Sequence, residues 1–183
     1  MLDPVIITDV GNRCFHLKGN GGLKGAVRVA VTEIENYTYM IKSDVADFYS
    51  STNHQILLDY CKQIIKDKRV ISILHQYMNR LKVYEGEYKL ITKGISKDCS
   101  LSPLMGALIL KSLDEIVHNG CAYVRYMDDW LILTKTRGQC RRLVKDMHKI
   151  MHQLRFKLAY DKTYIGRIKK GFDSLGYRFS EQV

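Results

Sequence analysis

The chain has 183 residues, enough for one domain or for one compact domain with a short appendage. Its 46% hydrophobic and 26% charged residues exclude a disordered composition. Lysine and arginine number 29 against 19 acidic residues, which gives a formal net charge of +10. Such an excess favours a polyanionic partner, most simply nucleic acid, and the alternative is a basic protein without such a partner.

The cysteines and the hydropathy of the chain indicate the cellular compartment in which the protein is expected. The five cysteines are an odd number and none has CxxC spacing, so neither a disulfide framework nor a zinc knuckle is expected. A cytoplasmic location in a reducing cytosol fits best. The first residues form no basic, apolar leader, and no stretch approaches the roughly 20 apolar residues of a membrane span. We therefore expect no signal peptide and no membrane partner.

The first half of the chain mixes extended and helical patterns. Residues 12–28 are rich in glycine and basic side chains and indicate an extended segment, a flexible turn and then a helix. Residues 37–45 are aromatic and β-branched, which predicts a strand. Apolar residues at helical spacing predict helices over 54–65 and 67–81, followed by a short hairpin over 82–92.

The second half begins with a helix predicted over about 102–117, with proline in its first turn, where proline is tolerated. Two apolar runs around an acidic pair predict a hairpin, and a basic amphipathic helix follows over about 137–154. This order of elements predicts an α+β fold with helices packed on one face of an antiparallel sheet. The strands expected here cover 121–127, 130–135, 156–160, 163–168 and 173–179.

Acidic residues mark the ends of two predicted strands. Asp128 and Asp129 are adjacent between apolar runs, and such a pair at a tight turn is costly unless a cation binds there. The alternative is an ordinary surface turn, in which aspartate is common. Asp44 ends the strand over 37–45 and is followed by Phe48 and Tyr49. Two-metal phosphoryl transfer needs oxygen ligands from separate strand ends, and these acids meet if their strands are neighbours.

Five motifs in a fixed order across residues 42–179 carry a family resemblance. They are Asp44 with Phe48 and Tyr49, then Gly94-Ile95-Ser96-Lys97-Asp98-Cys99-Ser100-Leu101-Ser102-Pro103, Tyr126-Met127-Asp128-Asp129, Asp161-Lys162-Thr163, and Gly171-Phe172-Asp173-Ser174-Leu175-Gly176-Tyr177. Together they resemble reverse transcriptases, and within these the bacterial group II intron-like type.

The resemblance implies a polymerase palm over residues 37–183. This is a ferredoxin-like antiparallel sheet with helices packed on one face, and it ends in a hairpin like a primer grip. Residues 1–36 would form a partial fingers segment, and the thumb would be absent. The implied activity is RNA-directed DNA polymerisation, in which dNTPs are added to the 3′ end of a DNA primer on an RNA template.

The resemblance also assigns roles to residues. Asp44, Asp128 and Asp129 would hold two Mg²⁺ ions, which Mn²⁺ could replace, with the Val45 carbonyl as a further ligand. Lys162 would act as a catalytic residue that protonates or neutralises the departing pyrophosphate, and its alternative is a solvated lysine at a turn.

Substrate contacts are implied for several more positions. Tyr49 would lie under the incoming sugar and exclude a 2′-hydroxyl by steric clash, although a core aromatic is the alternative. Tyr126 and Met127 would support the primer end. Arg28, in a segment that resembles the part of the fingers touching template and triphosphate, has a flexible surface turn as its alternative. The substrate-binding set is Arg28, Val45, Phe48, Tyr49, Lys97, Tyr126 and Met127.

The chain departs from the family pattern at one block, where Ser96-Lys97-Asp98 replaces Pro-Gln-Gly. Asp98 brings a side chain and a negative charge close to phosphates, which weakens binding unless Lys97 compensates. The alternative function is therefore a truncated or decayed reverse transcriptase that binds nucleic acid with little or no catalysis. A second chain supplying fingers or thumb would then be a partner. A palm-type nucleotide cyclase fits poorly, since no Gly-Gly-acidic signature occurs from Cys121 to Asp129.

The helix predicted over 137–154 is strongly basic. It carries Arg137, Arg141, Arg142, Lys145 and Lys149. These side chains could face a nucleic-acid backbone, but a solvated helix face is the commoner reason for such a pattern.

Overall fold

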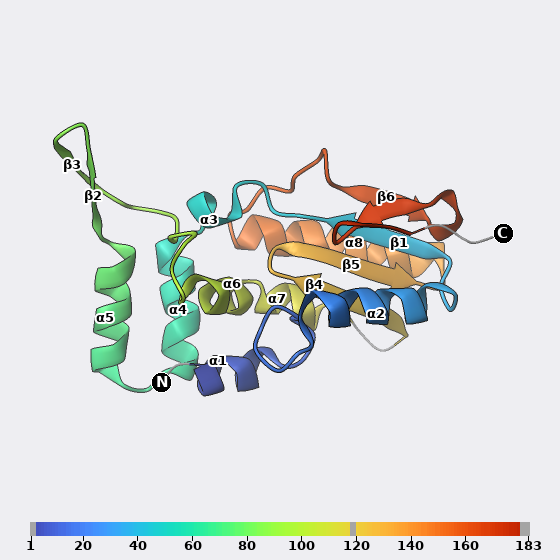
Figure 1. Ribbon diagram of the computed structural model, residues 1–183, viewed down its shortest axis with the longest axis horizontal. Coiled ribbons are helices and arrows are strands. Elements are labelled where there is room, and N and C mark those ends of the chain that lie inside the picture. The colour runs from blue at the N-terminus through green and yellow to red at the C-terminus, as the bar shows by residue number, and fades with distance from the viewer. Residues whose placement is uncertain (1–2, 118–119, 180–183) are drawn as a thin grey trace.

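The computed structural model describes residues 3–117 and 120–179, so the domain bounds expected at 1 and 183 lie outside the described residues. Its centre is a four-stranded sheet in which every neighbouring pair is antiparallel, in the order β4-β5-β1-β6. One helical segment separates β1 from the β4–β5 hairpin and another separates β5 from β6, which is the predicted ferredoxin-like arrangement (Figure 1). The strands are β1 (Tyr39–Ser43), β4 (Cys121–Tyr126), β5 (Asp129–Thr134) and β6 (Tyr164–Arg167).

Helices bury the larger core cluster on one face of the sheet. Ile41, Trp130 and Ile132 from the strands pack there with the apolar sides of the helices. None of the helices in the described residues is long and apolar enough to cross a membrane. The helices on this side are α1 (Asp3–Val10), α4 (His54–Ile64), α5 (Lys68–Met78), α6 (Ser102–Ile109), α7 (Lys111–Glu115) and α8 (Arg137–Gln153).

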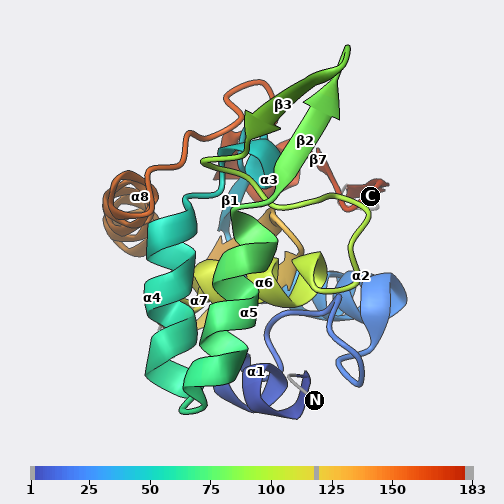
Figure 2. The same ribbon diagram turned by 90° about the vertical axis from the view of Figure 1, so that its left-hand side faces the viewer.

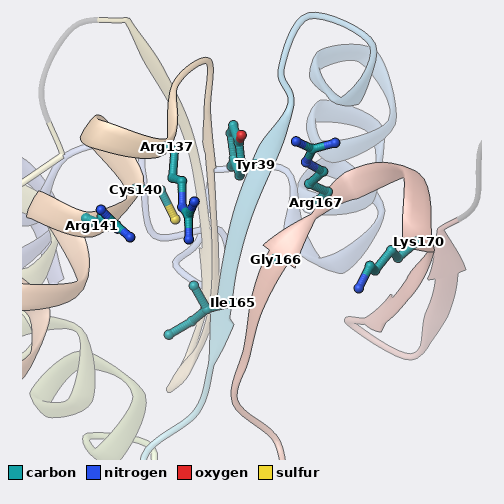
Figure 3. A pocket seen from close by; sticks show the side chains of 8 residues that line it. All are labelled: Tyr39, Arg137, Cys140, Arg141, Ile165, Gly166, Arg167 and Lys170. Carbon is teal, nitrogen blue, oxygen red and sulfur yellow. The ribbon is translucent and has the colours of Figure 1, made fainter.

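The helix α8 packs along β1 and β5, in the middle of the sheet. The capping box between Thr136 and Gln139 fixes its first turn. Because α8 lies over the central strands, a hollow remains between its first turns and the edge strand β6 (Figure 3).

The other face of the sheet is covered as well. The helix α2 (Gly22–Ile34) packs on β4 and β5, with Ala26 and Ala30 buried against Val124 and Leu131. Figure 2 shows α2 and α8 on opposite sides of the molecule. A hairpin of β7 (Phe172–Ser174) and β8 (Tyr177–Phe179) joins this second cluster. The α+β class and the antiparallel sheet are confirmed, and α2 adds a helix to a face that was expected to be free of helices.

Several local expectations need correction. The helix predicted over 102–117 is interrupted at Leu110, between α6 and α7. The strand predicted over 156–160 is reduced to a single bridge between Val45 and Leu158. The predicted hairpin over 82–92 is confirmed as β2 (Leu81–Tyr84) and β3 (Glu87–Leu90). The elements that were not predicted are α1, the short helix α3 (Phe48–Ser51) and a 3₁₀ turn at Ile168–Lys170.

Candidate active site

Strand register brings the three predicted acids together. The hairpin of β4 and β5 pairs Tyr126 with Asp129, which leaves Met127 and Asp128 at its turn. On the neighbouring strand, Ser43 pairs with Trp130. Because the two strands run antiparallel, the residue after Ser43 lies beside the residue before Trp130, and Asp44 meets Asp129 at the same end of the sheet.

The carboxylates are largely removed from water and incompletely paired. Asp44 is only 8% exposed. One oxygen each of Asp44 and Asp129, Oδ1 in both cases, is buried without a hydrogen-bond partner among the described residues. The other Asp44 oxygen, Oδ2, accepts a bond of 2.5 Å from the Lys162 ammonium. Buried carboxylate oxygens without donors are costly, and a bound proton or a nearby cation would lower that cost.

Burial and the closeness of the charged side chains shift the pKa values at the site. Burial, together with a hydrogen bond to Asp44 and its negative charge, raises the pKa of Asp128 to about 7. Burial and the charge of Asp44 raise the pKa of Asp129 to about 6. The bond to Asp44 raises the pKa of Lys162. The carboxylates therefore repel one another, and a nearby positive charge relieves that repulsion.

The acids fit a divalent cation by chemistry. Carboxylate and carbonyl oxygens are the donors that Mg²⁺ and Mn²⁺ prefer. Within residues 3–117 and 120–179, no three His, Cys, Asp or Glu side chains are already arranged as a ligand cluster. Lys162 instead supplies the positive charge at Asp44. The three aspartates thus offer the donor atoms that a divalent cation needs, but their side chains are not arranged around a common point as ligands.

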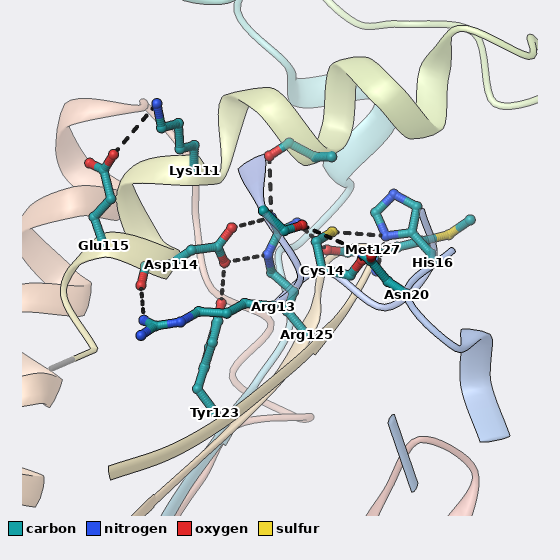
Figure 4. A network of polar contacts seen from close by, with 12 residues as sticks. Arg13, Cys14, His16, Asn20, Lys111, Asp114, Glu115, Tyr123, Arg125 and Met127 are labelled. Atoms are coloured by element: carbon teal, nitrogen blue, oxygen red, sulfur yellow. Dashed lines mark hydrogen bonds and ion pairs between the residues drawn. The ribbon is translucent and has the colours of Figure 1, made fainter. Parts of the chain in front are cut away.

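The buried ion pair of Arg125 and Asp114 contacts the turn that carries Asp128 (Figure 4). Arg125 is fully buried, and its guanidinium bonds both oxygens of Asp114, at 2.7 and 2.5 Å. The same guanidinium donates to the Met127 carbonyl at 3.0 Å, and Tyr123 donates to Asp114 at 2.6 Å. The network therefore connects α7 directly to the peptide that precedes Asp128.

His16 holds the same turn from the other side. The Met127 amide donates to His16 Nδ1 at 2.9 Å, so that nitrogen is an acceptor and the proton lies on Nε2. Nε2 then donates to the Pro103 carbonyl at 2.9 Å. Met127 has φ of 57°, a left-handed conformation that is unfavourable for methionine. The bonds from His16 and Arg125 to its peptide groups help to keep the turn in this conformation.

Lys162 reaches the site from the turn before β6. Its amide donates to the Ala159 carbonyl at 3.1 Å, and the neighbouring Thr163 hydroxyl is 2.7 Å from that of buried Ser43. These contacts place Lys162 next to Asp44, although the lysine side chain itself remains 59% exposed. Lys162 therefore lies at a turn and is largely solvated, as its alternative expected, and it also forms an ion pair with Asp44.

The aromatic pair after Asp44 divides into two roles. Tyr49 is half-buried, and its hydroxyl lies 3.6 Å from the Met127 sulfur, so its ring is beside the acidic turn. Burial, and then the charge of Asp128, raise its pKa. Phe48 is only 3% exposed and packs on Phe156, with ring centres 5.4 Å apart. The expectation that Phe48 contacts substrate is therefore wrong, because its ring belongs to the core.

The other residues predicted to contact substrate differ in burial and in their neighbours. Val45 is buried, with its backbone fixed on either side by bonds to the 157–159 segment. Tyr126 pairs with Asp129 and meets the His16 ring edge-on at 6.0 Å. Lys97 is exposed in the loop before α6, and Arg28 is exposed on α2. No described contact joins either of these two basic side chains to the acids.

Three positions that contact the acidic turn, directly or through Arg125, were missed from the sequence. His16, Asp114 and Arg125 hold the acidic turn, yet they belong to no motif. A buried arginine inside an apolar strand is the one available signal, because a charge is rarely buried without a partner. The partner, Asp114, could not be identified by spacing alone.

The loop that carries Lys97 depends on Gly94. This residue has φ of +91°, and a Cβ there would lie 2.9 Å from the Ser50 carbonyl oxygen and 3.0 Å from that of Tyr49. We expect Gly94→Ala to lower the free energy of unfolding by about 2–3 kcal/mol, since both strain and a backbone clash arise. Urea denaturation measures this loss.

Gly11 provides the matched control for this substitution. It has φ of +76° with nothing within 4 Å of an added Cβ. Gly11→Ala should therefore cost only the backbone strain, about 1 kcal/mol. Equal losses in the two variants would contradict the close packing of Gly94 on the Tyr49 segment.

Solved structures of telomerase share this fold. Apo telomerase from Candida tropicalis, truncated from its C-terminal domain, matches 85% of this chain and 37% of its own, with a TM-score of 0.67 and 15% identity. Telomerase from Candida albicans, in complex with a TWJ fragment of telomeric RNA, matches 85% of this chain and 32% of its own, with a TM-score of 0.66 and 11% identity. At such identity the likeness shows the fold alone.

Curated relatives extend the comparison to sequence. Protein YkfC of Escherichia coli is 20% identical over 218 aligned positions, which cover 97% of this chain and 57% of YkfC. An uncharacterized 91 kDa protein in cob intron of Schizosaccharomyces pombe is 28% identical over 94 positions, covering 51% of this chain and 12% of that protein. The chain thus spans a little over half the length of YkfC. Residues 7–179 match the family described as reverse transcriptase (RNA-dependent DNA polymerase), and the chain belongs to that family.

Proposed function

We propose that the protein is an RNA-directed DNA polymerase that adds dNTPs to a primer 3′ end by two-metal phosphoryl transfer. The observation that carries the proposal is the meeting of Asp44 with Asp128 and Asp129, with buried oxygens left unpaired. In this assignment residues 37–179 form the palm, and residues 3–36 belong to a partial fingers segment. RNA template, DNA primer and dNTPs are the corresponding partners.

The proposed ligands of the two ions are Asp44, Asp128, Asp129 and the Val45 carbonyl. When bound, Mg²⁺ or Mn²⁺ would supply Lewis acidity, favouring the deprotonated 3′-hydroxyl and offsetting charge on the triphosphate. Lys162 would move from Asp44 to the leaving pyrophosphate, as a cation or a proton donor, and its long, largely exposed side chain supports this role. Arg125 and His16 would keep the turn fixed during this step, which supports precise positioning.

Tyr49 is the proposed sugar selector. Its ring borders the acidic turn beside Met127, where the incoming nucleotide would lie. A bulky ring there would clash with a 2′-hydroxyl and so favour dNTP over rNTP.

A second candidate is a nucleic-acid-binding remnant with little catalysis. It is favoured by Ser96-Lys97-Asp98, where the resemblance implies Pro-Gln-Gly, and Asp98 is exposed on the loop that follows Gly94. Its negative charge would oppose phosphate at that position. A second chain that supplies fingers or thumb would be a partner of either form.

Primer extension on poly(rA)/oligo(dT) separates the two candidates. The polymerase is expected to extend the primer with dTTP in Mg²⁺ or Mn²⁺, and to use UTP far less efficiently. Binding of the duplex, measured by fluorescence anisotropy, is recorded on the same sample. Binding without any extension in either metal would favour the remnant over the polymerase.

A further inference from the structure

A basic groove lies at the end of the sheet away from the acids. Its volume is about 560 Å³, and it opens between the first turns of α8 and the edge strand β6. Arg137 and Arg141 border it from α8, Arg167 borders it from β6, and Lys170 borders it from the turn after β6 (Figure 3). We call this the α8–β6 groove.

The fold explains why this space is open. The helix α8 packs on β1 and β5, so its side chains do not cover β6, which pairs with β1 alone. The register pairs Tyr39 with Arg167 and Ile41 with Ile165. Ile165 is 45% exposed, so an apolar side chain forms part of the groove instead of the core.

The charges in the groove are not balanced. Four cationic side chains line it, and no acidic residue is among the lining residues. None of these four forms an ion pair within residues 3–117 and 120–179. All four residues are exposed to solvent, so an anion can reach them from outside. Neighbouring cations without partners repel one another, and an anionic ligand along the groove would relieve that repulsion.

The shape of the groove favours an extended polyanion. The cations stand on two walls of an open groove instead of surrounding one point. Between them lie Ile165 and Tyr39, with the Arg167 guanidinium 5.9 Å from the centre of the Tyr39 ring. Basic walls with an aromatic and apolar floor suit a nucleic-acid backbone whose sugars and bases contact the floor.

The groove is separate from the acidic site. Tyr39 begins β1, and Asp44 follows its last residue, so the two are five residues apart along an extended segment. This spacing corresponds to about 16 Å at the usual strand rise. A triphosphate held at Asp44 would therefore not occupy the groove.

We propose that the α8–β6 groove binds the phosphodiester backbone of single-stranded RNA outside the polymerisation site. The choice of RNA rests on the proposed function, whereas the charge and shape of the groove do not. The protein would thereby hold a segment of its RNA partner at a second place, in addition to the primer end.

The test compares two variants of equal charge. One carries Arg137→Gln, Arg141→Gln and Arg167→Gln in the groove. The control carries Lys62→Gln, Lys66→Gln and Lys68→Gln around the connection between α4 and α5, at the other end of the molecule in Figure 1. Anisotropy of a fluorescent single-stranded RNA of mixed sequence is titrated with each full chain at several salt concentrations, without divalent metal.

The groove variant should bind RNA at least tenfold more weakly at low salt. Its slope of log affinity against log salt should fall by about 2, since three phosphate contacts on a single strand contribute roughly 0.7 each. The control should keep both values close to wild type. Equal losses in the two variants would overturn the proposal, and so would displacement of the RNA by millimolar inorganic phosphate, which would indicate a small-anion site.

Primer extension on the same proteins separates this inference from the proposed function. Should wild type bind RNA through the groove yet extend no primer, the polymerase proposal fails and the groove stands. Should wild type extend primers while the groove variant binds RNA normally, the groove proposal fails and the polymerase stands.

Discussion

Asp128→Asn is expected to abolish primer extension and yet to stabilise the metal-free protein above neutral pH. The loss of extension should be roughly 10³-fold or more, as for other residues that act as one catalytic unit. The gain in stability follows first from burial and then from the contact with Asp44, because asparagine keeps the shape of the side chain and leaves no buried charge at this position.

The pH dependence gives this prediction a definite sign. The pKa of Asp128 rises from an ordinary value of 3.8 to about 7 in the folded chain. The folded state therefore binds more protons than the unfolded state between these values, and the free energy of unfolding falls as pH rises through this window. Because the Asp128 side chain is partly exposed, solvent screens part of this effect. The asparagine variant should therefore be more stable than wild type by roughly 1–2 kcal/mol at pH 8 without metal.

Urea denaturation with and without Mg²⁺ measures this effect. Mg²⁺ should stabilise wild type more at pH 8 than at pH 5, and should stabilise the variant little. Asp146→Asn on the exposed side of α8 is the matched control and should behave as wild type. Full extension by the Asp128 variant, or a stability profile identical to that of wild type, would contradict the account.

Arg125→Met is expected to lower the free energy of unfolding by about 3–5 kcal/mol. The guanidinium is fully buried, and its loss leaves the Asp114 carboxylate enclosed without its cation. The Met127 carbonyl also loses a donor, so the acidic turn should loosen. Thermal and urea unfolding measure the stability.

A double variant identifies the cause of this loss. Asp114→Asn combined with Arg125→Met removes both charges and leaves an acceptor for the Tyr123 hydroxyl. The double variant should recover at least half of the lost stability, because no isolated charge remains buried. The exposed pair of Asp173 and Arg178 is the control, and removing either partner should change stability by less than about 1 kcal/mol. A double variant no more stable than the single one would show that packing, and not the unpaired charge, dominates.

Much of the sheet could be predicted because its signals are local. The apolar runs on either side of Asp128 and Asp129 define a hairpin, and the observed strands end within a residue or two of the expected ones. The basic amphipathic helix over 137–154 and the strand before Asp44 were equally clear, since period and composition agree. The meeting of Asp44 with Asp129 was a hypothesis that the strand register bears out.

The remaining features depend on contacts between distant segments. Arg125 lies in an apolar strand, and only the packing of α7 shows that Asp114 neutralises it. Phe48 is adjacent to Tyr49 in one motif, yet the direction of the short helix α3 sends its ring into the core. The break at Leu110 and the seating of α2 on the second face are set by the shape of the core, which no local pattern encodes.

Iron-mediated cleavage of the chain tests most directly whether Asp44 and Asp128 form one metal site. Fe²⁺ bound in place of Mg²⁺, with ascorbate and peroxide, cuts the backbone near the ion. We expect cuts around Asp44 and around Asp128 in the same sample, and loss of both in Asp129→Asn. Cuts at only one of these stretches, or cuts at Asp44 that persist in the variant, would contradict a shared site.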